Sequence, residues 1–382
     1  MQEHTHLIPA HSRVWDEWMR RVAHDVFHTR TYHAFSQACG EGEGYLAVHG
    51  TRSRFIAWPY LLRPIDDTLA MRKLNWYDIT SVYGYSGPVV YGCELGDPFV
   101  GHALRALEEA WRTQRVITVF CRFHPVLKNY LRIEGAIGEG PIQGAQLLGH
   151  TVSIDLTNSY NTIWTNSYRR SLLQQLTQIK RLGMSIQIDS EWAHLPEFLD
   201  IYHETMLRNV APSYYFFSET YLRGLKAATQ GHSFLVSAHC GSEVVSACIV
   251  LEYGGILNMH LAGTKTNWLH CSPYKLIIDQ LIDWGQARGN RLFHLGGGRG
   301  ATQDSLFLFK SAFSPDRHRF HVGRYILDTE KYDSLCRSHR HAADEAGLTY
   351  ADSSYFPLYR TPLTAEGETD QAFGARKVET RA

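Results

Sequence analysis

The sequence predicts an α+β protein built from two tandem domains with mixed, mainly antiparallel sheets. At 382 residues the chain is longer than one ordinary domain, and with 44% hydrophobic and 20% charged residues each half can bury a core. Helical and strand-like apolar patterns also follow one another in a similar order in both halves. We expect a first domain over residues 1–150, completed by about 318–350, and a second over residues 151–317.

In the first half, Val14, Trp15, Trp18, Val22 and Val26 recur at helical spacing. A glycine- and tyrosine-rich turn, Tyr83–Pro88, separates two apolar strand patterns from a later helix. The expected elements are a helix at 13–27, strands near 44–49 and 53–62, a helix near 98–113 and a strand at 116–120.

In the second half, Trp164, Tyr168, Leu172, Leu176 and Ile179 predict one long amphipathic helix near 161–182 that ends at Gly183. Ser272-Pro273 is typical of a helix start, and Gly289 of its end. The other expected elements are helices at 192–208 and 218–229 and strands at 151–156, 233–238, 243–252, 256–262 and 291–295. The polar segment 361–382 is expected to be a disordered tail.

Composition excludes several classes of function. The chain has 38 basic and 38 acidic residues, which argues against a surface built for duplex DNA but leaves room for a local basic groove. Seven scattered cysteines, none in C-x-x-C spacing, indicate reduced thiols, and no histidine or cysteine pattern predicts a metal site. Without a visible signal peptide or an apolar run of membrane-spanning length, we expect a soluble cytoplasmic protein.

The segment His294–Phe313 is the most informative in the chain. An apolar strand ends at Leu295 and is followed by Gly296, Gly297 and Gly298, which allow a tight turn. Asp304 or Ser305 can then cap a short helix whose apolar positions surround Lys310. In such a setting a lysine either lies along the surface or takes part in chemistry.

Four segments, in the expected order over residues 25–335, resemble motifs of FemABX-like proteins. They are Asp78–Pro88 with its Tyr-Gly-Tyr-Ser-Gly-Pro run, Tyr168-Arg169-Arg170, Met206–Phe217 with its Tyr-Tyr-Phe run, and Leu295–Lys310. The resemblance implies two GNAT-like acyltransferase domains. It also implies transfer of an amino acid from aminoacyl-tRNA to an amine of a small peptide, a natural-product precursor or a muropeptide. No cofactor is implied, because the aminoacyl-tRNA is the donor.

The resemblance places Lys310 on the lysine that approaches the reacting ester, where it would stabilise the oxyanion. No Ser-His-Asp or Cys-His arrangement predicts a covalent intermediate, so we expect direct attack by the amine. Asp304 is the leading candidate for the general base, with helix capping as its other role. Asp78 could also be the base or orient the tyrosine turn, and His294 reads as a packed histidine.

Further residues are expected to bind substrate. Arg169 and Arg170 would contact an anion or the tRNA acceptor end, and Lys180 and Arg181 could extend this basic groove. The complete set of expected substrate-binding residues is Tyr83, Tyr85, Arg169, Arg170, Tyr214, Tyr215, Gly297, Gly298, Arg299 and Ser305.

Two other functions remain open at this point. One is an acyl-CoA-dependent N-acyltransferase acting on a small amine or a cell-surface sugar precursor. The segment Thr264–Pro273 weakens it, because it lacks the glycines with which GNAT enzymes bind the CoA pyrophosphate. The other is a catalytically inactive binding scaffold, against which the presence of Lys310 and the tyrosine turn argues.

Overall fold

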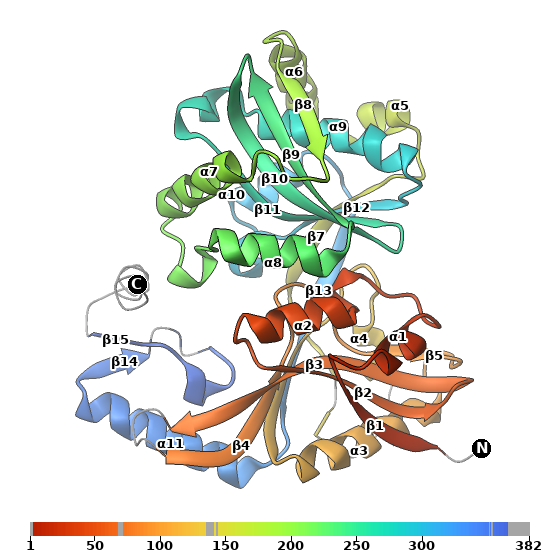
Figure 1. The fold of residues 1–382 in the computed structure, drawn as a ribbon, viewed down its shortest axis with the longest axis vertical. Helices are drawn as coiled ribbons and strands as arrows, with labels where there is room; N and C mark the ends of the chain where they lie inside the picture. The colour runs from red at the N-terminus through yellow and green to blue at the C-terminus, as the bar shows by residue number, and fades with distance from the viewer. Residues whose placement is uncertain are drawn as a thin grey trace. The chain divides into compact units, whose positions relative to one another are not determined.

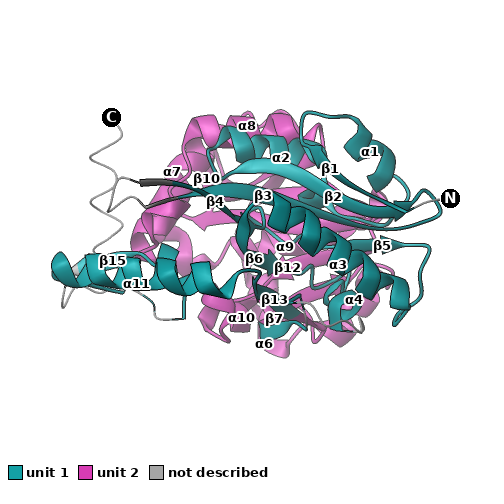
Figure 2. Cartoon of the chain, turned by 90° about the horizontal axis from the view of Figure 1, so that it is seen from below, with its two compact units in different colours: residues 1–148, 320–376 teal, residues 149–319, 377–382 magenta. Residues whose placement is uncertain are grey.

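The computed structural model describes residues 3–67, 72–134, 141–142, 144–350, 352 and 354–365 (Figure 1). The chain divides into two units (Figure 2). Unit 1 comprises residues 1–148 and 320–376, and residues 149–319 belong to unit 2. The chain therefore leaves the first unit, builds the second, and returns to complete the first.

Unit 1 is organised around a mixed sheet with strand order β1-β2-β3-β4-β6-β13, in which β5 pairs with β3. Only β4 and β6 run parallel among the neighbouring strands for which a register is described. The strands are β1 (His4–Pro9), β2 (Glu43–Thr51), β3 (Arg54–Asp67), β4 (Arg72–Thr80), β5 (Val89–Tyr91), β6 (Val116–Arg122) and β13 (Arg317–Ile326), with a separate pair β14 (Leu348–Tyr350) and β15 (Leu363–Ala365). The helices are α1 (Val14–Met19), η1 (Val26–His28), α2 (Arg30–Ala38), α3 (Pro98–Thr113), α4 (Tyr130–Glu134), α11 (Thr329–Glu345) and η6 (Leu358–Arg360).

Strand β3 is buried on both faces, which explains its nearly continuous apolar sequence. Phe55 packs with Trp18 in a cluster on one face, with ring centroids 5.0 Å apart. Trp58, on the other face, packs edge-on against Trp111 of α3 at 5.4 Å. The alternation of side chains along the strand thus supplies two hydrophobic clusters.

Unit 2 has the strand order β7-β12-β11-β10-β9-β8, in which β11 and β12 are parallel and the other pairs antiparallel. The strands are β7 (Gln146–Asp155), β8 (Ser185–Asp189), β9 (Ser233–Cys240), β10 (Glu243–Tyr253), β11 (Ile256–Thr264) and β12 (Leu292–Gly296). The helices are α5 (Tyr160–Thr162), η2 (Ile163–Ser167), α6 (Arg170–Lys180), α7 (Leu195–Arg208), η3 (Ser213–Tyr215), α8 (Glu219–Thr229), η4 (Thr266–Cys271), α9 (Tyr274–Ala287), η5 (Arg299–Ala301) and α10 (Ser305–Lys310).

One hydrophobic cluster joins the sheet of unit 2 to α6, α9 and α10, through residues such as Leu172, Ile278 and Phe307. Helix α7 packs on β10 and β11. A Cβ atom at Gly263 of β11 would lie 2.8 Å from the carbonyl oxygen of Ile201, so the glycine is what lets α7 approach the strand. The predicted mixed, mainly antiparallel fold is confirmed.

Two predicted helices are wrong in extent. The helix expected at 13–27 ends at Met19, because Asp25 turns inward and caps η1 instead of continuing the helix. The helix expected at 161–182 is broken at Tyr168, whose ψ of 136° is extended. The Tyr168 hydroxyl is held by Asp279 at 3.0 Å, so a tertiary contact overrides the helical pattern.

Other expectations also need correction. Ser272 does not cap α9, because it has a left-handed φ of 51° and its hydroxyl donates to the carbonyl oxygen of Leu269. Strands β1, β4, β8 and β13 and helix α11 were not anticipated. In the expected tail, residues 363–365 form β15, whereas 366–382 lie outside the described residues. Among the helices that the structure describes, none has the length and apolar character to cross a bilayer.

Candidate functional site

The glycine loop of unit 2 places Lys310 beside the end of β12. The strand finishes at Gly296, which turns the chain with a φ of 79°. The Nζ atom of Lys310 donates a hydrogen bond of 2.7 Å to the carbonyl oxygen of Gly297. Because the ammonium has three N–H groups, two remain for a ligand. Burial lowers the pKa of Lys310 to about 8, and the nearby charge of Asp304 opposes this shift.

Asp304 is the N-cap of α10. Its Oδ1 atom accepts from the backbone N–H of Phe307 at 3.0 Å, and its Oδ2 atom accepts from Nε of Arg299 at 2.9 Å. Burial raises the pKa of Asp304, but the hydrogen bonds from Phe307 and Arg299 outweigh it and leave the pKa below its usual value. The geometry therefore favours capping over general-base catalysis, and it occupies Arg299 in the same contact.

The loop glycines are required by packing. A Cβ atom at Gly298 would meet the carbonyl oxygen of Thr302 and Oδ1 of Asp304, and one at Gly297 would lie 3.0 Å from the carbonyl oxygen of His150. Protein atoms thus fill the space beside both glycines. Ser305 is exposed in the first turn of α10.

Arg169 and Arg170 are exposed at the start of α6. The backbone N–H of Arg169 donates to the carbonyl oxygen of Ala312 at 2.8 Å, which ties this helix start to the segment after α10. Arg317 is a further cation close to α10. Its guanidinium carbon lies over the ring of Phe307, 5.3 Å from the ring centroid. Burial and the charge of Arg169 lower the pKa of Arg317. Sequence reasoning missed Arg317, which a helix-by-helix search for basic runs does not find.

Lys180 does not extend this group of cations, contrary to prediction. Its Nζ atom is 2.8 Å from Oδ2 of Asp279, a carboxylate with no solvent exposure, and 4.6 Å from the ring centroid of Trp164. The hydroxyls of Tyr160 and Tyr168 donate to the same carboxylate. Lys180 therefore neutralises a buried charge.

The four predicted substrate-binding tyrosines divide between the units. Tyr214 and Tyr215 follow α7 in unit 2; the ring of Tyr214 is half exposed, and the Tyr215 carbonyl accepts from the hydroxyl of Tyr202 at 2.9 Å. In unit 1, the carbonyl of Tyr83 accepts from the hydroxyl of Tyr32 at 2.8 Å. The ring of Tyr85 contacts Phe320 edge-on, with centroids 5.2 Å apart.

Asp78 is neither placed as a base nor bound to the tyrosine turn. It has no solvent exposure, and its two oxygens pair with Arg63 at 2.7 Å and Arg360 at 2.5 Å. The hydroxyl of Tyr359 donates to it at 3.3 Å. Asp78 therefore holds the segment around η6 against β4 of the same unit.

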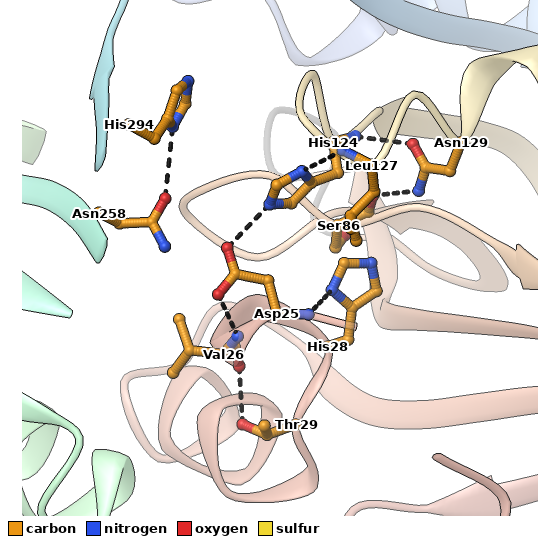
Figure 3. Close-up of polar contacts among 10 residues, drawn as sticks. All are labelled: Asp25, Val26, His28, Thr29, Ser86, His124, Leu127, Asn129, Asn258 and His294. Carbon is orange, nitrogen blue, oxygen red and sulfur yellow. Dashed lines mark hydrogen bonds and ion pairs between the residues drawn. The ribbon is translucent and has the colours of Figure 1, made fainter. Parts of the chain in front are cut away.

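Sequence reasoning missed a buried polar cluster in unit 1, drawn in Figure 3. The Nε2 atom of His124 lies 2.8 Å from Oδ2 of Asp25, and both side chains are fully buried. The backbone N–H of Leu127 can only donate, and it lies 3.1 Å from Nδ1 of His124. Nδ1 is thus the acceptor, and Nε2–H donates to Asp25. Asp25 and His28 lie in the run His24–His28, and an acidic residue close to two histidines is a sequence signal that could have indicated a polar cluster here.

The same cluster holds the tyrosine turn. Asn129 accepts from the backbone N–H of His124 at 2.8 Å and donates to the carbonyl oxygen of Ser86 at 2.7 Å (Figure 3). Gly84 leaves room for Phe27, whose ring a Cβ atom at that position would strike. His28 is also fully buried, and burial followed by the charges of neighbouring histidines lowers its pKa well below the usual value. The conformation of the turn is therefore set by residues far away in the sequence.

His294 is 2% exposed on β12, and its Nδ1 atom lies 3.3 Å from Oδ1 of Asn258 (Figure 3).

Helix α9 starts after η4, where the Trp268 and Ser272 backbone N–H groups donate to carbonyls of the same turn. This turn replaces the glycine-rich loop that would bind a CoA pyrophosphate. Within the described residues, no group of three histidine, cysteine or acidic side chains could hold a metal ion.

Comparisons with known proteins agree with this architecture. Residues 166–303 match the family of acetyltransferase (GNAT) domains. The crystal structure of FemX superposes with a TM-score of 0.64 at 12% identity, covering 87% of this chain and 99% of that one. A DUF2156 domain from Agrobacterium fabrum superposes with a TM-score of 0.52 at 12% identity, covering 82% and 90%. The predicted resemblance to FemABX-like, GNAT-type proteins is confirmed at the level of the fold.

A local sequence match adds to the likeness in fold. Over 98 residues the chain is 31% identical to UDP-N-acetylmuramoylpentapeptide-lysine N(6)-alanyltransferase from Weissella viridescens. The match covers 25% of this chain and 29% of that enzyme, so it spans less than a third of the curated relative.

Proposed function

We propose that this protein is an aminoacyltransferase that forms an amide bond between an aminoacyl group and the amine of a peptide, with a muropeptide precursor as the leading acceptor. Aminoacyl-tRNA is the proposed donor. The observation that carries the proposal is Lys310, a partly buried amine held 2.7 Å from the Gly297 carbonyl oxygen at the end of a GNAT-type strand and loop. The cytoplasmic location stays a prediction.

In the proposed reaction the acceptor amine attacks the ester carbonyl of the donor. A C–N bond forms, the C–O bond to the ribose breaks, and the ribose oxygen takes up a proton while the amine loses one. Negative charge develops on the carbonyl oxygen between these events. The two remaining N–H groups of Lys310 would stabilise it, and one such donor is worth about 2.7–4 kcal/mol of barrier.

The acceptor class is supported by the local match to an enzyme named for alanyl transfer to the lysine of a muramoylpentapeptide. Exposed Arg169 and Arg170, together with Arg317, give unit 2 a set of cations suited to phosphates of the donor. The turn at η4 speaks against acyl-CoA as the carrier, because its Trp268 and Ser272 amides donate to carbonyls of the turn and its Thr266 amide donates to Glu204.

The test is to incubate the purified protein with alanyl-tRNA or acetyl-CoA and a UDP-linked muramoylpentapeptide. We expect an alanylated peptide whose formation is abolished by prior ribonuclease treatment. Release of CoA thiol together with an acetylated acceptor would instead show that the protein is an acyl-CoA-dependent N-acyltransferase. No product with either donor, across a panel of charged tRNAs and peptide amines, would favour the binding scaffold.

A further inference from the structure

Unit 1 contains a pocket of about 250 Å³ at the C-terminal end of α3, formed by residues to which no role has been given above. Trp76 comes from β4, Arg112 and Arg115 from the end of α3 and the turn after it, and Asp328 and Lys331 from the start of α11. The first residues of β6 complete the lining.

The pocket is cationic. Arg112 and Arg115 are exposed, and Arg112 interacts electrostatically with the carboxyl groups of Glu108 and Asp328. Lys331 lies 2.5 Å from Asp328, so the single lining carboxylate neutralises one of the three cations. The lining side chains therefore carry more positive than negative charge, and the two guanidinium groups among them can bind phosphate through two parallel hydrogen bonds.

The backbone is in an uncommon conformation at one lining residue, Arg115, and at Asn75, next to a second lining residue. Arg115 has a left-handed φ of 61° directly after the end of α3, a position where glycine is the usual residue. Asn75, next to Trp76, has a φ of 52° where the register of β3 with β4 shifts. Irregularities of this kind redirect side chains and are frequent beside ligand sites.

We propose that this pocket binds a nucleotide, with its phosphate between Arg112 and Arg115 and its base against the ring of Trp76. Trp76 is partly exposed, and the ammonium of Lys331 lies over its ring, 5.8 Å from the ring centroid. A flat aromatic ring and a positive charge therefore lie side by side in this pocket. The base supplies a flat partner for the indole ring and the phosphate supplies charge. The nucleotide can belong to a nucleotide-linked small molecule or to the backbone of an RNA, and the proposal does not depend on the transfer reaction.

The test compares wild-type protein with Arg115→Gly and Lys128→Gly by calorimetric titration with UMP, inorganic phosphate and uncharged tRNA. Lys128 is the matched control, because it is an exposed cation of the same unit with a left-handed φ of 51° but lies outside the pocket. Both variants lose one charge and gain glycine where it suits the backbone, so both should keep or raise the melting temperature.

We expect Arg115→Gly to weaken UMP binding by at least about tenfold and Lys128→Gly to leave it unchanged. A matching loss of tRNA affinity in Arg115→Gly alone identifies RNA as the source, and unchanged tRNA binding identifies a nucleotide-linked small molecule. The proposal is overturned if UMP binds wild type and Arg115→Gly equally, or does not bind wild type. Trp76→Leu should weaken UMP but not phosphate; equal binding of UMP and phosphate to wild type would remove the base from the site.

Discussion

The ammonium of Lys310 and the carbonyl oxygen of Gly297 are joined by a hydrogen bond of 2.7 Å across the glycine loop. This contact fixes the direction of a long, flexible side chain before any substrate binds. The loop supplies the hydrogen-bond acceptor and α10 supplies the lysine, so the position of the ammonium depends on both segments.

The first prediction concerns turnover. Lys310→Ala should lower the single-turnover rate by about 100-fold or more while changing donor affinity little, because the charge it meets exists mainly in the transition state. Rates measured at saturating donor will show this. Lys226→Ala is the control, since that lysine contacts Glu191 on another part of unit 2. A Lys310→Ala rate within about threefold of wild type would refute the assignment.

The second prediction concerns pH. With its pKa lowered to about 8 by burial, Lys310 loses its charge as the pH rises through 8, so the rate that depends on this cation should fall above that pH. Lys310→Arg keeps its charge throughout, and its residual activity should lack the descending limb. The measurement is single-turnover rate against pH from 6 to about 10. Identical limbs in both proteins would mean that another group titrates.

The third prediction separates the two roles of Asp304. Asn is as good a helix cap as Asp, so Asp304→Asn should keep most of the turnover rate if capping is the role. Asp304→Ala should lower the free energy of unfolding by about 1 kcal/mol. Urea unfolding and single-turnover rates measured on both variants decide. A stable Asp304→Asn protein without activity would make Asp304 the base after all.

The fourth prediction concerns the buried pair in unit 1. Removing His124 takes the donor from Oδ2 of Asp25 and leaves this buried carboxylate with the Val26 N–H on Oδ1, so His124→Ala should cost about 3–5 kcal/mol in the free energy of unfolding. His124→Gln places an amide donor near the position of Nε2 and should recover part of this loss. His341→Ala, at an exposed position of α11, should change stability by less than about 0.5 kcal/mol. Equal stability of all three variants would contradict the pairing.

The fifth prediction concerns donor binding. Combined Arg169→Ala and Arg170→Ala should weaken binding of charged tRNA and make log affinity less steep against log salt concentration, because fewer counterions are released. Arg223→Ala is the control, as an exposed arginine paired with Glu219 on α8. Filter binding at several salt concentrations measures the slope. A double variant with the wild-type slope would exclude these arginines from the contact.

Local patterns predicted the regular parts of this protein well. The helix expected at 98–113 is observed at those residues, because Asp97 caps it, Pro98 opens it and its apolar stripe is uninterrupted. The strands of unit 2 other than β8 are predicted for a similar reason, since β-branched runs end at clear turns such as Gly254-Gly255. The position before an apolar run predicted Asp304 or Ser305 as the cap of α10, and the structure has Asp304 there.

The sequence by itself determined the type of most elements, the two-part organisation and the glycine loop with its lysine, because each depends on neighbours in the chain. Only the tertiary structure decided which charged groups form ion pairs with other residues of the chain. The sequence predicts roles in the site for Lys180 and Asp78. In the structure Lys180 pairs with the buried carboxylate of Asp279, and Asp78 pairs with Arg63 and Arg360. Asp25 lies in the histidine-rich run His24–His28, but nothing in its local sequence pairs it with His124, which is 99 residues away along the chain. Their pairing becomes necessary only in the folded protein, where both side chains are fully buried.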